Sequence, residues 1–230
     1  MLADDLTVAL RRLAVNEDVW VVVLTGAGEK AFSVGADLKE RAGFSLVEWY
    51  DNRESIRGMF SALRGLPQPS IASIFGYAFG GGFELALSCD LIVAAEGTTV
   101  GLPEVRVGLL PAGGGTQLLT RKVGAARAKR MIFLGQRIDV QVAADIGLVH
   151  RVVPRDELEK ESLSLAEEIC QGSPVAVREA KRAIESALGV PLEDGIAIEH
   201  ESWRRVIESD DRAEGIAAFN EKRTPQWKNR

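Results

Sequence analysis

The sequence predicts an α/β fold, and two observations carry this prediction. Short apolar runs alternate with longer amphipathic stretches between residues 1 and 100, which is the pattern of strands that alternate with helices. After Pro154 the pattern is helical as far as residue 219. We therefore expect an α/β core at residues 1–168 and a helical region at residues 169–230.

The composition is that of a globular protein. The chain has 230 residues, of which 46% are hydrophobic and 27% charged, and its net charge is −5. This charge argues against nucleic acid and anionic membranes as partners, and no apolar run approaches the roughly 20 residues that span a bilayer. The start, MLADDL, lacks the basic region of a secretory signal, and two cysteines are too few for a disulfide framework. We expect a cytoplasmic protein with no membrane partner.

The first elements follow from the spacing of apolar residues. Three leucines lie on one face of a predicted helix over residues 4–15. The run at 19–24 predicts a strand, buried on both faces if the sheet is parallel. Residues 25–31 match a dinucleotide-binding fingerprint on paper, but no helix follows and no second strand ends in an acidic residue. We interpret this segment as a turn.

A second turn, at residues 33–38, leads into the next helices. Its Gly35 and Ala36 leave a backbone N–H accessible, and Asp37 is placed to cap a helix that begins near Leu38. A long amphipathic stretch over residues 45–66 predicts the following helix.

Residues 70–89 carry the central hypothesis about function. An apolar run at 71–75 predicts a buried strand, three glycines follow at 80–82, and good helix formers come next. The free N–H groups of such a first helical turn can hold an anion or stabilise an oxyanion. Glu84 lies in that turn. A carboxylate there can move protons beside a polarised carbonyl, or it can simply complement the helix dipole.

The later elements contain a second glutamate at a turn. Pro103 fixes this turn and presents Glu104 directly after it. The glycines at 113–115 do not form a P-loop, because no lysine precedes Thr116. The other predictions are strands at 90–95 and 148–153, helices at 117–134 with an interruption at Gly124 and at 139–146, and helices over 155–219 with breaks at 172–174 and 189–191.

Four segments share a family pattern: AFSVGADL at 31–38, FGGGFELALSCD at 79–90, LPEVRVGLLP at 102–111 and GGTQ at 114–117. In this order and spacing the chain resembles the enoyl-CoA hydratase/isomerase (crotonase) family over essentially its whole length. Residues 36–42 look most like the methylglutaconyl-CoA hydratase subgroup, some of whose members also bind AU-rich RNA.

The resemblance implies a spiral of ββα units topped by C-terminal helices that build trimers, commonly paired into hexamers. It implies an acyl-CoA thioester as the substrate and no separate cofactor. Members of the family usually carry a further upstream segment, which supplies an edge strand and a contact to CoA.

The resemblance also assigns chemical roles. The N–H groups of Ala36 and Gly81 would hold the thioester carbonyl oxygen. Glu84 would be the base that activates water for attack at C3, and Glu104 would deliver a proton to C2. The activity implied is that of an enoyl-CoA hydratase, with reversible syn addition of water across the 2,3 double bond.

Further residues are implied as substrate or CoA contacts. Phe219 and Lys222, near the C-terminus, would contact the CoA of a neighbouring subunit. The full set of implied contacts is Val34, Ala36, Asp37, Leu38, Gly80, Gly81, Pro103, Phe219 and Lys222.

Several alternatives stay open. An isomerase needs only one proton shuttle, usually at the Glu104 position, so two glutamates favour a hydratase. The other alternative functions are those of a methylglutaconyl-CoA hydratase, an AU-rich RNA-binding protein and a non-catalytic family member. The net charge of −5 argues against RNA, although basic residues gather at 121–130. His150 and His200 have no metal-ligand spacing, so we expect no metal site.

Overall fold

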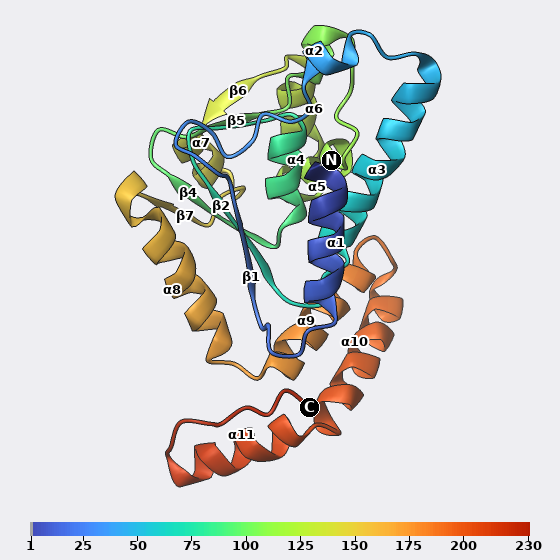
Figure 1. The fold of residues 1–230 in the computed structure, drawn as a ribbon. Coiled ribbons are helices and arrows are strands. Elements are labelled where there is room, and N and C mark those ends of the chain that lie inside the picture. The colour runs from blue at the N-terminus through green and yellow to red at the C-terminus, as the bar shows by residue number, and fades with distance from the viewer. Residues whose placement is uncertain (1) are drawn as a thin grey trace.

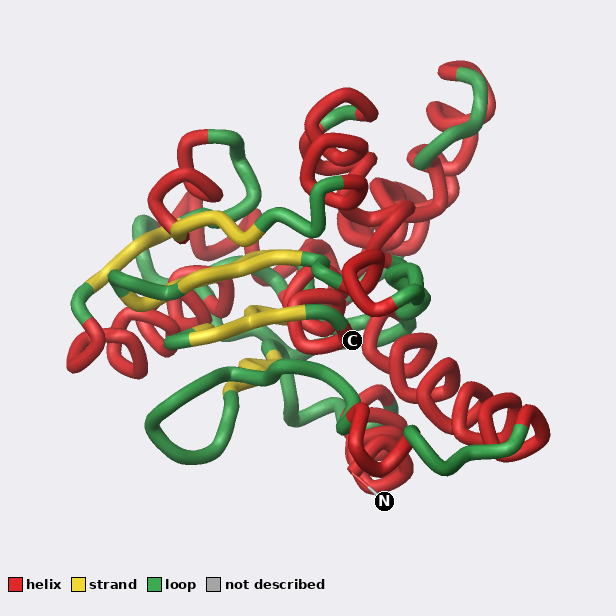
Figure 2. The backbone as a smooth tube through the Cα atoms, turned by 90° about the horizontal axis from the view of Figure 1, so that it is seen from above, coloured by secondary structure: helices red, strands yellow, loops and turns green. Residues whose placement is uncertain are grey.

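The computed structural model describes residues 2–230. Its centre is a parallel four-stranded sheet in the order β1-β2-β4-β7, whose strands lie side by side in Figure 2. The strands are β1 (Val22–Thr25), β2 (Ser70–Ile74), β4 (Leu91–Ala95) and β7 (Arg151–Val153). Helices lie between successive strands of this sheet, which confirms the predicted α/β class.

Side chains of this sheet alternate between two apolar layers. Ile71 and Val93 pack with α8 (Leu158–Cys170) on one face. Ile74 packs with α4 (Gly81–Ser88) in the main core on the other face. β2 is buried at all five positions because both of its faces are covered. The helix that carries the central glycine turn is thereby fixed against the middle of the sheet.

A second sheet was not predicted from the sequence. It has the order β3-β5-β6, with β3 (Tyr77–Phe79), β5 (Thr99–Gly101) and β6 (Arg137–Asp139). Each strand has three residues, which is too short for an alternating pattern to stand out. Since β2 and β3 precede α4 directly, they form the ββα unit that the resemblance implied.

The other helices of the core agree with the predicted ranges. The 45–66 helix is observed with Ser45 as its N-cap, and the 117–134 stretch is divided at Gly124 as expected. α1 packs beside α3. These helices are α1 (Leu2–Ala14), α2 (Leu38–Arg41), α3 (Leu46–Arg64), α5 (Gly115–Val123), α6 (Ala125–Phe133) and α7 (Val140–Asp145), with the 3-10 turns η1 (Glu104–Val107) and η2 (Arg155–Glu157).

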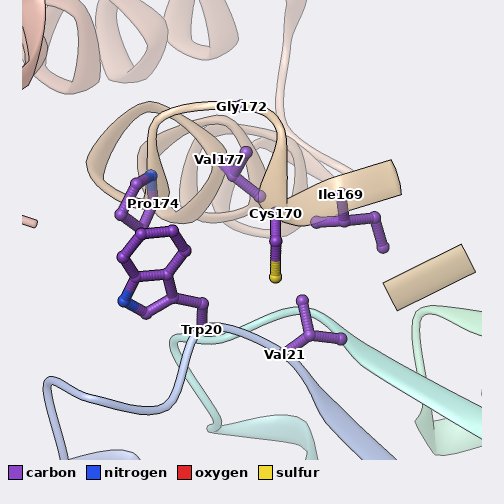
Figure 3. A pocket seen from close by; sticks show the side chains of 7 residues that line it. All are labelled: Trp20, Val21, Ile169, Cys170, Gly172, Pro174 and Val177. Carbon is purple, nitrogen blue, oxygen red and sulfur yellow. The ribbon is translucent and has the colours of Figure 1, made fainter. Parts of the chain in front are cut away.

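The C-terminal helices α9 (Pro174–Ala187), α10 (Leu192–Ile207) and α11 (Asp210–Glu221) lie beyond the sheet, at the bottom of Figure 1. Figure 3 shows the joint: Trp20 and Val21, just before β1, face residues of the α8–α9 corner. The crevice between them has no room for a water molecule. The joint is therefore closely packed. A break before Ser209, which caps α11, was not predicted.

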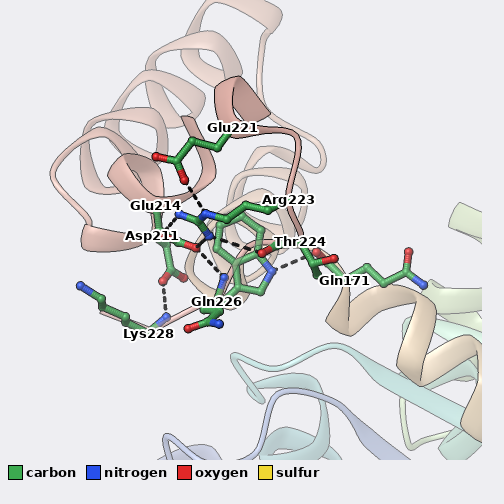
Figure 4. Close-up of polar contacts among 9 residues, drawn as sticks. Gln171, Asp211, Glu214, Glu221, Arg223, Thr224, Gln226 and Lys228 are labelled. Carbon is green, nitrogen blue, oxygen red and sulfur yellow. Dashed lines mark hydrogen bonds and ion pairs between the residues drawn. The ribbon is translucent and has the colours of Figure 1, made fainter. Parts of the chain in front are cut away.

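The chain end folds back on α11 (Figure 4). Arg223 donates to both carboxylate oxygens of Glu214, at 2.6 and 3.0 Å. This pairing, together with a hydrogen bond from the Gln226 N–H, lowers the pKa of Glu214 to about 2. The Trp227 indole donates to the Gln171 carbonyl at 2.9 Å, which ties the tail to the end of α8.

The sequence-based predictions for β1 and for the boundary between the two regions have different outcomes. The first strand begins at Val22 rather than Val19, and of its residues only Val22 is buried, because β1 lies at the edge of the sheet and not inside it. The prediction of a strand buried on both faces was wrong. The division at residues 168 and 169 stays a prediction, and that boundary lies within α8.

No helix within residues 2–230 is both long and apolar enough to cross a membrane. The cytoplasmic location stays a prediction.

Candidate active site

The site is built on the turn between β3 and α4. The Gly80 N–H donates to the Gly101 carbonyl at 3.0 Å, which ties the turn to β5. At Gly82 an added Cβ would lie 2.0 Å from the Ser33 carbonyl oxygen, so only glycine fits there. The backbone that approaches Gly82 so closely is therefore the protein's own segment at Ser33.

The segment that approaches is the second predicted turn, residues 33–38. Ser33 pairs with Ala78 of β3, and its carbonyl accepts from the Phe79 N–H at 3.0 Å. Gly35 has φ +85°, and its ideal Cβ position lies 2.9 Å from the Gly81 nitrogen. Asp37 caps α2 by accepting from the Lys39 N–H at 2.8 Å, as predicted. The two turns therefore touch.

Two backbone donors in these turns lack acceptors. Among the described residues, neither the Ala36 N–H nor the Gly81 N–H donates a hydrogen bond. Gly81 is the first residue of α4, so its N–H has no helical partner. Residues 34–36 are exposed, so a ligand can reach this side of the turn. These groups are suited to bind an external oxygen atom.

Glu84 lies one turn into α4 with its side chain 3% exposed. Its Oε1 accepts from the N–H groups of Gly113 and Gly115, both at 2.7 Å. Burial raises the pKa of Glu84, and the two N–H donors act in the opposite direction because they favour the carboxylate. Its Oε1 is occupied by these bonds, so the group is held in one orientation.

Glu104 begins η1, directly after Pro103. Its Oε1 lies 3.3 Å from the ideal Cβ position of Gly80, at the turn that precedes Glu84. Its Oε2 is buried and has no hydrogen-bond partner in residues 2–230. Burial, with a further contribution from the charge of Glu84, raises the pKa of Glu104 to about 7. A carboxyl of this kind holds a proton near neutral pH.

The structure thus brings together most of the predicted site. Both glutamates, the two N–H donors and Pro103 surround the touching turns, and Val34, Asp37 and Leu38 are exposed beside them. Phe219 and Lys222 lie at the end of α11, beyond the sheet and away from α4. Phe219 is 83% exposed. Within one chain these two residues are not part of the same site.

Two groups of residues were missed. The N–H groups of Gly113 and Gly115 hold Glu84, and the Arg64 guanidinium donates to the Gly113 carbonyl at 2.9 Å. The glycine run at 113–115 was the available signal, but it served only to exclude a phosphate loop and as part of the family pattern. The other missed feature is a pocket of about 210 Å³ lined by Arg53, Arg57, Phe60, Arg64 and residues 112–114.

No group of three or more His, Cys, Asp or Glu side chains suited to a metal ion occurs in the part of the chain that is described. His150 has a structural role instead, because its Nδ1 accepts from the Ile92 N–H at 3.0 Å.

Comparison with known proteins agrees with this architecture. The family model described as enoyl-CoA hydratase/isomerase matches residues 1–230. The crystal structure of an enoyl-CoA hydratase from Bacillus anthracis superimposes with a TM-score of 0.97 at 44% identity, covering 100% of this chain and 89% of that one. The fold is therefore the crotonase fold.

Two curated relatives are similar along nearly the whole chain. The mitochondrial enoyl-CoA hydratase domain-containing protein 2 of Mus musculus is 42% identical, with 97% of this chain and 77% of the relative covered. The mitochondrial methylglutaconyl-CoA hydratase of Rattus norvegicus is 40% identical, with 97% and 72% covered.

Proposed function

From the premise that the chain belongs to the enoyl-CoA hydratase/isomerase family, we propose that this enzyme adds water across the 2,3 double bond of a 2-enoyl-CoA thioester. The observation that carries the proposal is that two glutamates with different hydrogen bonding lie at turns whose Ala36 and Gly81 N–H groups have no acceptor within residues 2–230. Hydration needs one group to remove a proton, one to supply it, and donors to hold the charge between them.

The N–H groups of Ala36 and Gly81 receive the thioester carbonyl oxygen. As water adds at C3, negative charge develops on this oxygen in an enolate. Two fixed donors stabilise the enolate without rearranging, and one such donor is typically worth about 3–4 kcal/mol of the barrier. Their proposed role is supported by the absence of a protein acceptor for either group in residues 2–230.

Glu84 is the base. Its Oε1 is held by two N–H donors, which favour the ionised form, so the carboxylate takes a proton from water while the water oxygen bonds to C3. Glu104 is the acid. With a pKa of about 7 it carries a proton near neutral pH and gives it to C2, where the enolate electrons form the new C–H bond. The overall reaction adds one water, and proton exchange with solvent returns both groups to their starting states.

Contacts to the CoA carrier are proposed for the exposed turn and for α11. The residues that border the proposed thioester site are Val34, Asp37, Leu38, Gly80 and Pro103. Phe219 and Lys222 serve the site of a neighbouring subunit, which fits their distance from α4 in one chain. This arrangement requires an oligomer, and the family resemblance makes a homotrimer or a pair of trimers the assembly that we propose. The exposed apolar side chains on the C-terminal helices support such an assembly.

The test is to identify the product made from crotonyl-CoA. The proposal predicts a 3-hydroxyacyl-CoA whose mass exceeds that of the substrate by one water, with no metal or redox cofactor added. A 3-enoyl-CoA is tested in parallel. If crotonyl-CoA is unchanged and the 3-enoyl-CoA only shifts its double bond at constant mass, the enzyme is an isomerase and the hydration proposal is wrong.

A further inference from the structure

A stripe of arginines on α3 faces the loop that holds Glu84. Three arginines and one phenylalanine of this helix are spaced by four, three and four residues, so they lie on one face. They are Arg53, Arg57, Phe60 and Arg64. With Ala112, Gly113 and Gly114 opposite, they enclose the pocket of about 210 Å³. At roughly 30 Å³ for each water-sized group, this volume admits a short acyl chain with a polar end.

The charges of this arginine pocket are only partly compensated. Arg53 makes no hydrogen bond or ion pair with any residue from 2 to 230. Arg57 pairs with Glu54 at 3.3 Å, but both side chains are 68% exposed, so the pair is weak. Arg64 is engaged with the neutral Gly113 carbonyl. The pocket therefore presents an excess of positive charge.

The arginine pocket adjoins the catalytic carboxylate. Gly113 lines it, and the ideal Cβ position of Gly113 lies 2.8 Å from Oε2 of Glu84 and 2.4 Å or less from two ring atoms of Phe60. Burial raises the pKa of Glu84, and the charge of Arg53 opposes this rise, so the two groups are close enough to interact. A substrate whose C3 atom lies beside Glu84 thus has the pocket close to the rest of its acyl chain.

We propose that the arginine pocket binds a carboxylate at the far end of the acyl group, so that the preferred substrates are enoyl-CoA thioesters of dicarboxylic acids. Guanidinium groups bind carboxylates through paired, charge-assisted hydrogen bonds. A neutral acyl chain would instead strip water from these cations without replacing it. This inference rests on the proposed function, because it assumes that the thioester lies between Glu84 and Glu104.

Binding of two saturated thioesters tests the pocket without requiring turnover. Glutaryl-CoA and pentanoyl-CoA have five-carbon acyl groups and differ in the terminal carboxylate. We expect calorimetry to show that wild type binds glutaryl-CoA roughly tenfold or more tightly than pentanoyl-CoA. The double variant Arg53→Gln/Arg57→Gln should lose most of this preference, and Arg53→Lys should keep part of it. Arg130→Gln, an exposed arginine of α6, is the matched control for loss of a positive charge.

The outcomes separate the pocket from the reaction. Both ligands carry the same CoA phosphates, so equal weakening of both in the double variant would assign the arginines to CoA and overturn the proposal. Equal binding of both ligands by wild type would overturn it as well. If 2-pentenoyl-CoA is hydrated in that case, the proposed hydration holds and only the proposed carboxylate pocket is wrong. If the carboxylate preference depends on the arginines but no enoyl-CoA is hydrated, the pocket stands and the proposed reaction fails. Thermal midpoints verify that each variant is folded.

Discussion

Glu84 and Glu104 differ in what their oxygens contact, and this difference sets their proposed roles. Glu84 is held by two backbone donors. Glu104 has a buried Oε2 without a partner in the described chain. Burial disfavours the charged form of both, but only Glu84 has hydrogen bonds from another segment that restore it. The pair is thereby suited to share one proton at neutral pH.

The pH dependence of kcat/KM should reflect this single proton. Above a pKa of about 7, Glu104 loses the proton that C2 requires, so kcat/KM for crotonyl-CoA should decline. At low pH it should decline again as Glu84 gains a proton, at a pKa above the usual carboxyl value because burial raises it. These limits belong to the pair as a unit. A rate that stays constant from pH 6 to pH 9 would contradict the assignment.

Stability should also depend on Glu104. Its folded pKa of about 7 exceeds the ordinary value of 4.5, so its contribution is fully present below pH 4.5 and is lost as the pH rises through 7. Wild type should therefore lose thermal stability relative to Glu104→Gln between pH 5 and pH 8, since glutamine carries no charge. Melting curves of the two proteins across this range provide the measurement. A difference between them that does not change with pH would count against a buried, proton-holding Glu104.

At the scale of elements, the touching turns form the proposed oxyanion site. Gly35→Ala should reduce kcat/KM by a large factor, because the new Cβ would lie 2.9 Å from the Gly81 nitrogen. Gly28→Ala is the matched control: Gly28 has φ +80°, close to the +85° of Gly35, but nothing lies within 4 Å of its ideal Cβ position. Both variants should lose about 1–2 kcal/mol of stability through backbone strain, and Gly35→Ala should lose more because its Cβ also meets the Gly81 nitrogen.

Both variants lose stability, but only Gly35→Ala should also lose a large factor in kcat/KM. Initial rates with crotonyl-CoA and melting curves, measured side by side, separate the two effects. Equal activities in the two variants would show that the gap between the turns is not used by the substrate.

Elements long enough to show a periodic apolar pattern could be predicted from the sequence, and short elements could not. The 45–66 helix and the break at Gly124 follow from apolar spacing and from glycine. The three strands of the second sheet have too few residues to show a period. The N–H groups of Gly113 and Gly115 approach Glu84 across 29 and 31 residues. Such contacts depend on how distant segments pack, which no local pattern encodes.

At the scale of the whole molecule, the C-terminal helices present apolar side chains that the chain itself does not cover. Leu192 is 75% exposed and Trp203 53% exposed. Monomeric proteins rarely expose large connected apolar areas. A homo-oligomer formed through these helices would bury them.

If the proposed assembly, whose subunit number comes from the family resemblance, is right, light scattering should give the mass of a trimer or a hexamer. The variant Leu192→Lys/Trp203→Glu should shift the mass toward the monomer because it introduces charge at the proposed contact. Val8→Lys, at an exposed position of α1, is the matched control for replacing an exposed apolar side chain and should leave the mass unchanged. A monomeric wild type would remove the proposed role of Phe219 and Lys222 at a neighbouring site.

The paired glutamates are the central claim, and the loss of conjugated enoyl-thioester absorbance tests it most directly. Crotonyl-CoA is mixed with wild type, Glu84→Gln, Glu104→Gln and the exposed control Glu96→Gln. An active wild type and control are expected, with both site variants slower by roughly 10²–10⁴. If either site variant keeps the wild-type rate, hydration by a pair of carboxyl groups is contradicted.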